Sequence, residues 1–433
     1  MTDIKILLVQ IGVILLTANA VGWLLGKFRQ PQVVGEMVAG VLLGPSLLGW
    51  VAPEFFATLF PPDSLGPLFT LSEIGLLLFM FMVGLELDTK KLRELGYTAV
   101  VISKISIIVP FVLGALLAIF LFPRVTDGSL PFTGFVLLMG AAMSVTAFPV
   151  LARILGERNL LGTKLGTLTI ACAAINDVTA WCLLAVIVAL VRSEVNQLLL
   201  WQLLAGLLIY FAVMIFVLRP LLKKLVARQA DTEKPDKIIA VLLVCMFASS
   251  LATEWLGIHA LFGAFFAGVI VTKENGFTEE VRRRLKVPVV VLLIPLFFAF
   301  TGLRTNIGLI SGSEMILYCG LVFLVAVTGK FGGSMIAARV MGTPWRESAA
   351  IGVLMNTRGL IELVILNIGL DIGVLTPPLF SIMVFMAMGT TLITTPILLW
   401  IYPEHREKRL QPRREAVPAQ QVDSTNLSRT IPT

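Results

Sequence analysis

The chain has 433 residues, of which 57% are hydrophobic and only 14% carry a charge, and its mean hydropathy is +0.92. Charged residues make up about a quarter of a soluble domain, so this composition excludes a water-soluble protein and predicts a polytopic helical membrane protein. The net charge of +7 does not indicate nucleic-acid binding, because the basic residues fall in alternate loops between apolar segments.

Thirteen apolar segments are predicted to cross the membrane as helices. They are residues 4–26, 33–50, 67–87, 97–122, 131–154, 165–191, 199–222, 238–256, 258–272, 287–304, 313–341, 347–370 and 376–402. The first is too long for the apolar part of a signal peptide and lacks a small-residue cleavage site. We therefore expect residues 1–403 to form one membrane domain and the polar residues 404–433 to form a disordered basic tail.

The basic residues predict the orientation of the chain. One set of alternate loops, together with the tail, holds 27 of the 34 Lys and Arg residues, and the opposite set holds four. Because Lys and Arg accumulate in cytoplasmic loops, the N-terminus is expected outside and the C-terminus in the cytoplasm. A bacterial inner membrane or another plasma membrane is the expected location, with an organelle membrane as the alternative.

Two of the predicted spans contain polar residues and helix breakers at mid-membrane depth. The fifth contains GAAMSVTAFPVLAR (140–153) and the twelfth contains GVLMNTRGLIE (352–362), which align so that Ser144 stands opposite Asn356. Pro149 and Gly359 are expected to break the two helices. Because these spans are seven helices apart, they cross the bilayer in opposite senses, which predicts an inverted repeat of spans 1–6 and 8–13. Broken helices at matching positions of such a repeat indicate the binding site of a secondary transporter.

The sixth span carries an aspartate near its centre, Asp177, preceded by Asn176. A charged residue at that depth costs about 2.5–3.5 kcal/mol on insertion scales and usually has a function. We predict that Asp177 binds a monovalent cation and a proton in alternation, and that Asn176 adds an amide but no second charge. Free backbone carbonyls of the broken helices are expected to help bind the cation.

Three further charged residues lie deep in the predicted spans. Lys330 is expected to pair with Asp177 when no ion is bound or to stabilise the negative end of a half-helix, and a fixed counter-charge is the alternative. Arg358 and Glu362 are four residues apart on one half-helix, so we expect them to pair and to support the site rather than to touch the ion.

The sequence resembles the monovalent cation/proton antiporter family that includes Kef-type potassium efflux systems and plant CHX-type exchangers. The resemblance covers nearly the whole chain and rests on QPQVVGE (30–36), GPSLLG (44–49), FMVGLEL (81–87), SVTAFPVLAR (144–153), NDVTAW (176–181) and MNTRGL (355–360). It implies a sodium/proton-antiporter-like fold, with a core of crossed broken helices, a separate dimerisation domain, and a homodimer that works by an elevator-like movement. It also implies that Asp177 carries the ion, that Lys330 faces it, and that Thr146 lies near it. Ser144, beside the same predicted break, is a further candidate ion-binding residue.

The predicted function is therefore the exchange of K⁺ or Na⁺ for H⁺, electroneutral and 1:1 because one carboxylate is available. A passive cation channel or a Kef-like K⁺ efflux pathway on the same scaffold is the alternative, and a membrane sensor or assembly subunit is a third possibility. The sequence contains no metal-ligand cluster, catalytic triad or phosphate loop, so we expect neither an enzyme nor a bound cofactor. Besides the lipid bilayer and a second copy of the chain, a separate regulatory subunit is a conceivable partner.

Overall fold

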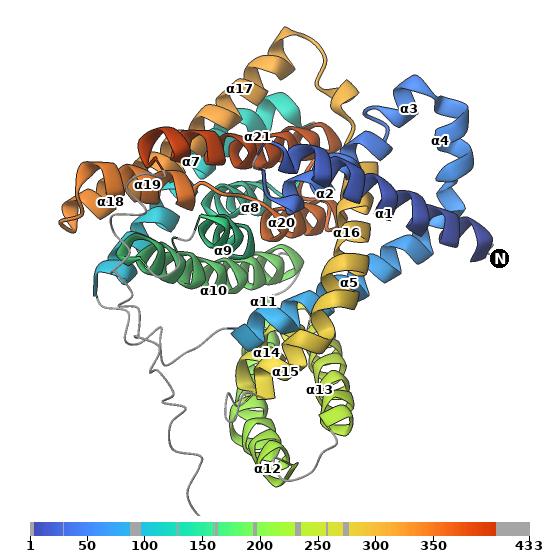
Figure 1. The fold of residues 1–433 in the computed structure, drawn as a ribbon, viewed down its shortest axis with the longest axis vertical. Helices are drawn as coiled ribbons and strands as arrows, with labels where there is room; N and C mark the ends of the chain where they lie inside the picture. The colour runs from blue at the N-terminus through green and yellow to red at the C-terminus, as the bar shows by residue number, and fades with distance from the viewer. Residues whose placement is uncertain are drawn as a thin grey trace, which may run out of the picture.

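The computed structural model describes residues 4–403, except residues 29, 87–96, 127, 129, 159, 161–162, 194–196, 230–234, 257–258 and 272–276. The regular secondary structure of this part of the chain is entirely helical (Figure 1). The predicted tail, residues 404–433, lies outside the described residues.

The helices of the first half follow the predicted spans closely. They are α1 (Ile4–Gly26), α2 (Gln32–Leu43), α3 (Leu48–Val51), α4 (Pro53–Leu59), η1 (Pro62–Ser64), α5 (Leu65–Glu86), α7 (Tyr97–Val125), α8 (Phe132–Ser144), α9 (Phe148–Glu157) and α10 (Lys164–Ser193). A linking segment follows, made of α11 (Gln197–Ala212), η2 (Val213–Leu218) and α12 (Arg219–Gln229).

The second half has the same general make-up. Its elements are α13 (Pro235–Trp255), α14 (Ala260–Ile270), α15 (Phe277–Lys286), η3 (Val287–Leu293), α16 (Ile294–Leu303), η4 (Ile307–Leu309), α17 (Ser313–Val327), η5 (Thr328–Gly332), α18 (Gly333–Val340), α19 (Trp345–Met355), α20 (Leu360–Asp371) and α21 (Pro377–Ile401). The segments η2, η3 and η5 are π-helical and continue directly into the α-helices beside them.

Each predicted span corresponds to a helix or a run of helices in the structure. In the described part of the chain, ten helices or continuous runs of helices are long and apolar enough to cross a membrane. The number is eleven if α19 and α20, which are bent by 41°, count as one span. The other two predicted spans contain the shorter apolar helices α8 and α14. Helices are the expected result, because a lipid-exposed backbone must satisfy its hydrogen bonds within its own segment.

The packing of the first half recurs in the second. Helix α1 packs on α2 as α13 packs on α14, and α7 packs on α8 as α18 packs on α19. Between the halves, α2 packs on α16 and α14 packs on α5. If spans 1–6 correspond to spans 8–13, these are the helices that have to pack on each other. The packing therefore agrees with the predicted repeat.

Glycines allow the two crossings between the halves to be very close. A Cβ atom on Gly40 of α2 would lie 2.2 Å from the carbonyl oxygen of Phe298 in α16, and one on Gly84 of α5 would lie 2.1 Å from that of Phe265 in α14. Real Cβ atoms do not come that close to a backbone oxygen, so each crossing requires a residue without a side chain. Small residues commonly provide such contacts between membrane helices.

The helices divide into two packing groups. The scaffold group consists of α1, α2, α5 and α13–α16, and the core group consists of α7–α10 and α17–α21. Contacts between the groups are fewer than contacts within them, and they involve mainly α2 and η4 against α21 and α16 against α20. Helices α8, α9, α19 and α20 lie together between α10 and α21, in the middle of the core group (Figure 1).

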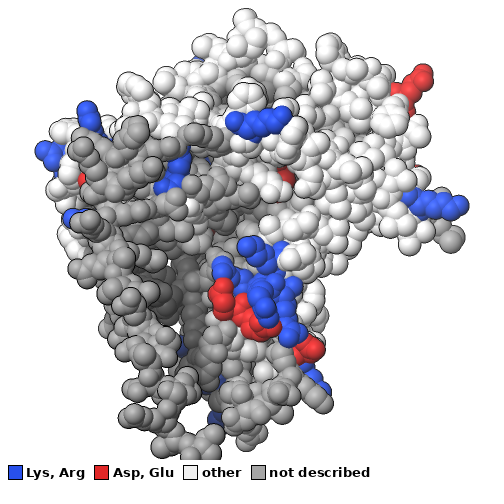
Figure 2. Space-filling model, viewed as in Figure 1, with Lys and Arg blue, Asp and Glu red and all other residues white. Residues whose placement is uncertain are grey.

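The outer surface is mostly uncharged. Figure 2 shows that Lys, Arg, Asp and Glu occupy few places on the visible face, and the largest mixed cluster lies over α15. There Arg282, Arg283 and Arg284 pair with Glu279, Glu280 and Asp236. Large apolar side chains are exposed elsewhere, among them Trp23, Trp50, Trp255 and Trp400, as expected for a surface in contact with lipid.

Candidate functional site

The two predicted broken helices meet at their breaks. Between α8 and α9 the backbone leaves the helix at Val145 and resumes it at Phe148, and between α19 and α20 it is non-helical from Asn356 to Gly359. The backbone N–H of Ala147 donates to the carbonyl of Thr357 over 2.9 Å. Each break therefore supplies a partner for a backbone group that the other break sets free, as a buried non-helical backbone requires.

Pro149 does not act as the sequence predicted. We expected it to break the helix, yet α9 begins at Phe148 and Pro149 stands in its first turn. Proline is tolerated there because the first N–H groups of a helix have no intrahelical partner. The break thus precedes the proline and is stabilised by contacts with the second broken helix.

Two buried cations bind the last carbonyls of α8. The guanidinium of Arg358 donates to the carbonyls of Ala142 and Met143 over 2.8 and 2.9 Å, and the ammonium of Lys330 donates to the carbonyl of Ser144. These carbonyls form the negative end of the α8 dipole. Arg358 and Lys330 are both completely buried, so they compensate this end of the helix inside the protein.

Arg358 also forms the predicted pair with Glu362, at 3.0 Å between Nη1 and Oε1. Both side chains are completely buried. The backbone of Arg358 is fixed by Thr391 of α21, whose hydroxyl accepts from the Arg358 N–H at 2.9 Å and lies 2.7 Å from its carbonyl oxygen. Arg358 thus joins α8, α20 and α21 around the break.

Lys330 lies in η5, the π-helical segment between α17 and α18. Such segments are frequent at functional sites. Its ammonium donates to the carbonyls of Ser106 and Ser144 and lies 3.0 Å from one terminal atom of the Asn176 amide. An ammonium is only a donor, so the amide atom that faces it must be the oxygen, Oδ1. All three N–H groups of Lys330 then have neutral oxygen acceptors.

The other side of the Asn176 amide faces Ser103 of α7. With Oδ1 toward Lys330, Nδ2 donates to the Ser103 hydroxyl over 2.6 Å and toward the Ser103 carbonyl over 3.3 Å. Ser106 and Thr146 lie 3.0 and 3.2 Å from Oδ1. Asn176 is only 1% exposed, and its amide is fully hydrogen-bonded in this orientation.

Asp177, the next residue of α10, has no such partners. It is 2% exposed, and neither carboxylate oxygen forms a hydrogen bond with the described residues. Removing a carboxylate from water without hydrogen-bond partners is costly unless a counter-charge or a proton neutralises it. Yet no Asp177–Lys330 ion pair is present in the described structure, because the three donors of Lys330 are used elsewhere.

The structure separates the roles of the two hydroxyl residues predicted near the ion. Thr146 lies at the centre of the break, where its Oγ1 donates to the carbonyl of Met355 over 2.9 Å and adjoins Asn176. The hydroxyl of Ser144 instead donates back to the carbonyl of Ala141 over 2.8 Å. Ser144 therefore contributes its backbone carbonyl, as an acceptor for Lys330, rather than its side chain.

Sequence reasoning missed several polar residues of the cluster. Ser103 and Ser106, both completely buried, face the Asn176 amide, and their three-residue spacing inside an apolar span was the signal that could have revealed them. The sequence singled out Asn356 only as the counterpart of Ser144 in the repeat. Its buried Oδ1 has no hydrogen-bond partner in the described part of the chain, so it offers a further oxygen near the break.

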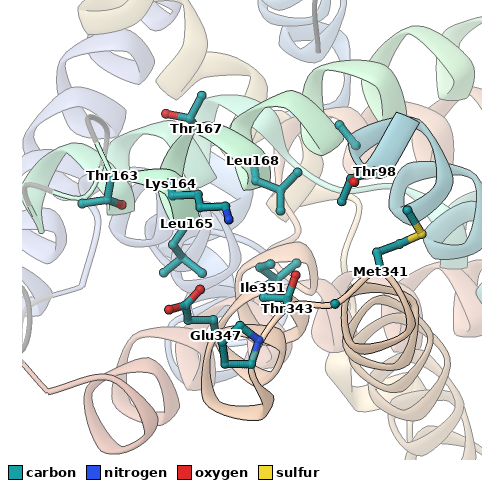
Figure 3. Close-up of a pocket in the computed structure, with 13 residues that line it drawn as sticks. Thr98, Thr163, Lys164, Leu165, Thr167, Leu168, Met341, Thr343, Glu347 and Ile351 are labelled. Carbon is teal, nitrogen blue, oxygen red and sulfur yellow. The ribbon is translucent and has the colours of Figure 1, made fainter. Parts of the chain in front are cut away.

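A cavity of about 560 Å³ opens at one end of the core group. It lies between the first turns of α7, α10 and α19 and the loop before α19, and Thr98, Lys164 and Glu347 are among its lining residues (Figure 3). None of the predicted site residues lines it. Leu168, the lining residue of α10 that is nearest to Asp177 in sequence, precedes Asp177 by nine residues, about 13 Å along a helix.

A comparison with known protein families shows which family the chain belongs to. Residues 13–401 match the model of the family described as "Sodium/hydrogen exchanger, transmembrane". The chain belongs to the sodium/hydrogen exchanger family. The chain is 40% identical over 400 residues to "Na(+)/H(+) antiporter NhaS4" of Synechocystis, covering 92% of the chain and 97% of that protein.

Relatives also occur among larger proteins. The chain is 42% identical to "Cation/H(+) antiporter 17" of Arabidopsis thaliana, covering 92% of the chain and 48% of that protein. It is 32% identical to "K(+)/H(+) antiporter 1" of Saccharomyces cerevisiae, covering 99% and 50%. The chain thus spans about half the length of these two relatives.

A solved structure has the same fold. The sodium proton antiporter MjNhaP1 of Methanocaldococcus jannaschii superimposes with a TM-score of 0.57, covering 92% of this chain and 97% of that one, at 15% sequence identity. The predicted sodium/proton-antiporter-like fold is therefore confirmed. The chain is a multi-pass integral membrane protein of a transporter family.

Proposed function

We propose that the protein exchanges a monovalent cation, K⁺ or Na⁺, for a proton by alternating access. The observation that carries this proposal is the isolation of Asp177, a buried carboxylate without hydrogen-bond partners beside two interrupted helices. A carboxylate in that position has to bind a proton or a cation to be neutral. Relatives named as Na⁺/H⁺ and K⁺/H⁺ antiporters support both transported ions.

The proposed ion site consists of Asp177 and the oxygens around the break, with Thr146 and Asn356 contributing from the two broken helices. In this proposal the half-helix end at Phe148 stabilises the negative charge of Asp177 whenever the carboxylate is empty. Lys330, Arg358 and Glu362 compensate charge and do not contact the ion. No bound cofactor is part of this mechanism.

The exchange is proposed to be electroneutral and 1:1. One cation bound at Asp177 replaces one proton, so the net charge of the core is the same in both loaded states. Asn176 adds no second charge, and the three acceptors around Lys330 are neutral oxygens, so no second ionisable carboxylate takes part in the exchange.

We propose an elevator-like movement of the core group against the scaffold group. The limited contact between the groups supports it.

Four side chains connect the two groups at one end of the protein. They are Thr301, Arg304, Asn367 and Asp371, and we call this set the outer clamp. Arg304 donates to Asn367 and pairs with Asp371 at 2.6 Å, and Asn367 donates to Thr301 over 3.0 Å. The cavity near Lys164 lies at the predicted cytoplasmic end, whereas the outer clamp joins the two groups at the other end. We therefore interpret the structure as a state that is closed toward the outside.

The remaining parts of the proposal concern assembly and location. We propose a homodimer formed through the scaffold group, with the N-terminus outside and the C-terminus in the cytoplasm. The distribution of Lys and Arg over the loops supports this orientation. A bacterial inner membrane or another plasma membrane is the proposed location, and residues 404–433 are proposed to form a separate cytoplasmic tail.

Sealed proteoliposomes with an internal pH dye and an acidic interior test the exchange directly. K⁺, Na⁺ or Li⁺ is added outside, with and without holding the membrane voltage at zero by an ionophore for a different ion that is present at the same concentration on both sides. We expect cation-triggered alkalinisation that persists at zero voltage and identifies the transported ion. Cation flux without proton movement would instead establish a channel, and alkalinisation that depends on voltage would contradict electroneutrality.

A further inference from the structure

Besides Lys330, a second residue outside the two broken helices acts on the orientation of the Asn176 amide. Ser103 of α7 is completely buried, and its hydroxyl lies 3.3 Å from the carbonyl of Cys172 and 2.6 Å from the Asn176 amide. A hydroxyl has one proton to donate. With Nδ2 of Asn176 on its side, Ser103 donates this proton to the Cys172 carbonyl, and its oxygen accepts from the amide.

The groups that Ser103 presents to Asn176 are therefore acceptors only. Its hydroxyl oxygen and its carbonyl both accept from Nδ2, at 2.6 and 3.3 Å. This directs the amide nitrogen toward α7 and the amide oxygen toward Lys330, 3.0 Å from its ammonium. Without the hydroxyl, only the more distant carbonyl would hold the amide nitrogen on this side.

The direction of the amide determines what Lys330 can bind. With Oδ1 facing it, the ammonium has three neutral acceptors and forms no ion pair with Asp177 in the described structure. With the amide turned by 180°, its NH₂ group would face the ammonium, and two donors repel each other. Lys330 would then lose one acceptor, and the unpartnered carboxylate of Asp177 would become the available replacement.

We propose that Ser103 is a positioning residue for cation binding, which orients the Asn176 amide so that Lys330 is held away from Asp177. The proposal rests on the proposed function of Asp177 as the cation site. Ser103 does not touch the ion. It acts through Asn176 and Lys330, and it keeps the carboxylate available to the cation by removing its internal competitor.

The test compares Ser103→Ala with Ser103→Thr in proteoliposomes, using whichever of K⁺ and Na⁺ the wild type exchanges. We expect Ser103→Ala to raise the KM for the cation about tenfold, since Lys330 then competes for Asp177, while the maximal rate changes less than twofold. Ser103→Thr keeps the hydroxyl and is expected to restore a KM within about twofold of the wild type. Ser334→Ala is the matched control, because Ser334 is an equally buried core serine whose hydroxyl has no hydrogen-bond partner among the described residues.

A second readout separates positioning from simple destabilisation. The cation concentration that half-maximally protects the detergent-solubilised protein against heat should rise in Ser103→Ala in parallel with the KM. A merely structural role would lower the unfolding temperature and the maximal rate, and would leave this concentration unchanged. If Ser103→Ala does not fold, Ser103→Cys, which keeps the size but weakens the acceptor, takes its place.

The outcomes distinguish this inference from the proposed function. An unchanged KM and an unchanged protective concentration in the alanine and cysteine variants, with Asp177→Asn inactive, would overturn the role of Ser103 and leave the exchange mechanism standing. Persistent exchange in Asp177→Asn would instead remove the proposed function itself, and with it the basis of the inference.

Discussion

The hydroxyl of Thr146 in the first broken helix donates to the carbonyl of Met355 in the second, over 2.9 Å. Met355 is the last residue of α19, so this bond satisfies a carbonyl at a helix end, where no intrahelical N–H is available. Thr146 also adjoins the amide of Asn176 at 3.2 Å. One side chain thus connects both breaks to the residue beside Asp177, which makes the ion site sensitive to small changes at the crossing.

Asp177→Asn is expected to abolish exchange without unfolding the protein. The amide is nearly isosteric with the carboxylate but carries no charge and does not ionise. It therefore cannot bind a proton and a cation in alternation. Exchange is measured in proteoliposomes, and folding is measured by size-exclusion chromatography and thermal unfolding. Asp236→Asn, at an exposed carboxylate of the scaffold group, is the control and should exchange normally. Wild-type rates in Asp177→Asn would contradict the proposed site.

Arg358→Met is expected to destabilise the protein by about 3–5 kcal/mol, because it leaves the buried Glu362 carboxylate without its partner and two carbonyls of α8 without donors. The measurement is the shift in thermal unfolding in detergent. Arg283→Ala is the matched control, since Arg283 is 76% exposed in its pair with Glu280 and exposed pairs contribute about 0–1 kcal/mol.

The double variant Arg358→Met/Glu362→Met refines this prediction. Removing both charges should restore part of the lost stability, because the uncompensated carboxylate is gone and only the α8 carbonyls lack donors. If the double variant is less stable than Arg358→Met, the destabilisation comes from lost packing rather than from the unpaired charge.

Cross-linking the outer clamp is expected to stop exchange. Thr301→Cys and Asn367→Cys replace two side chains whose polar ends lie 3.0 Å apart, one in the scaffold group and one in the core group. Cys182, Cys245 and Cys319, which are not fully buried, are first replaced by alanine. A short methanethiosulfonate cross-linker should then reduce exchange at least tenfold, and a reductant should restore it, if the core has to leave the scaffold at this end.

The control for this experiment is a cross-link within one group. Asp236→Cys/Arg284→Cys replaces an exposed ion pair between α13 and α15, both of the scaffold group, and its cross-linking should leave exchange unchanged. Full activity in the cross-linked Thr301/Asn367 variant would contradict the elevator-like movement at this interface, while the cation/proton exchange itself would remain.

Much of the fold could be predicted from the sequence, because hydropathy identifies membrane helices and because Gly140 and Gly352 align in two segments of opposite sense. The structure supports that alignment. A Cβ atom on Gly140 would lie 2.9 Å from the carbonyl oxygen of Phe111, and one on Gly352 would lie 2.7 Å from that of Phe331. The two glycines therefore occupy corresponding positions against the preceding helix.

Less of the candidate site than of the fold could be predicted from the sequence. Asp177, Lys330 and Arg358 could be found because a charge inside an apolar span is conspicuous. The binding of Lys330 to Asn176 rather than to Asp177 could not be found, since these neighbours on α10 differ only in the direction of their side chains. Ser103 and Ser106 were missed because serine is common in membrane helices and carries no charge.

Asn176→Asp is expected to make exchange sensitive to membrane voltage. The substitution places a second carboxylate about 3.0 Å from the ammonium of Lys330, where the pair adds a titratable charge to the core. If one cation then exchanges for two protons, one net charge crosses the membrane in each cycle, and a potential of 100 mV contributes about 2.3 kcal/mol to transport. In proteoliposomes an imposed voltage alone should then drive proton movement in Asn176→Asp when the cation is present on both sides, whereas the wild type should not respond. A variant that remains active and indifferent to voltage would show that the residue at position 176 does not determine the charge carried per cycle.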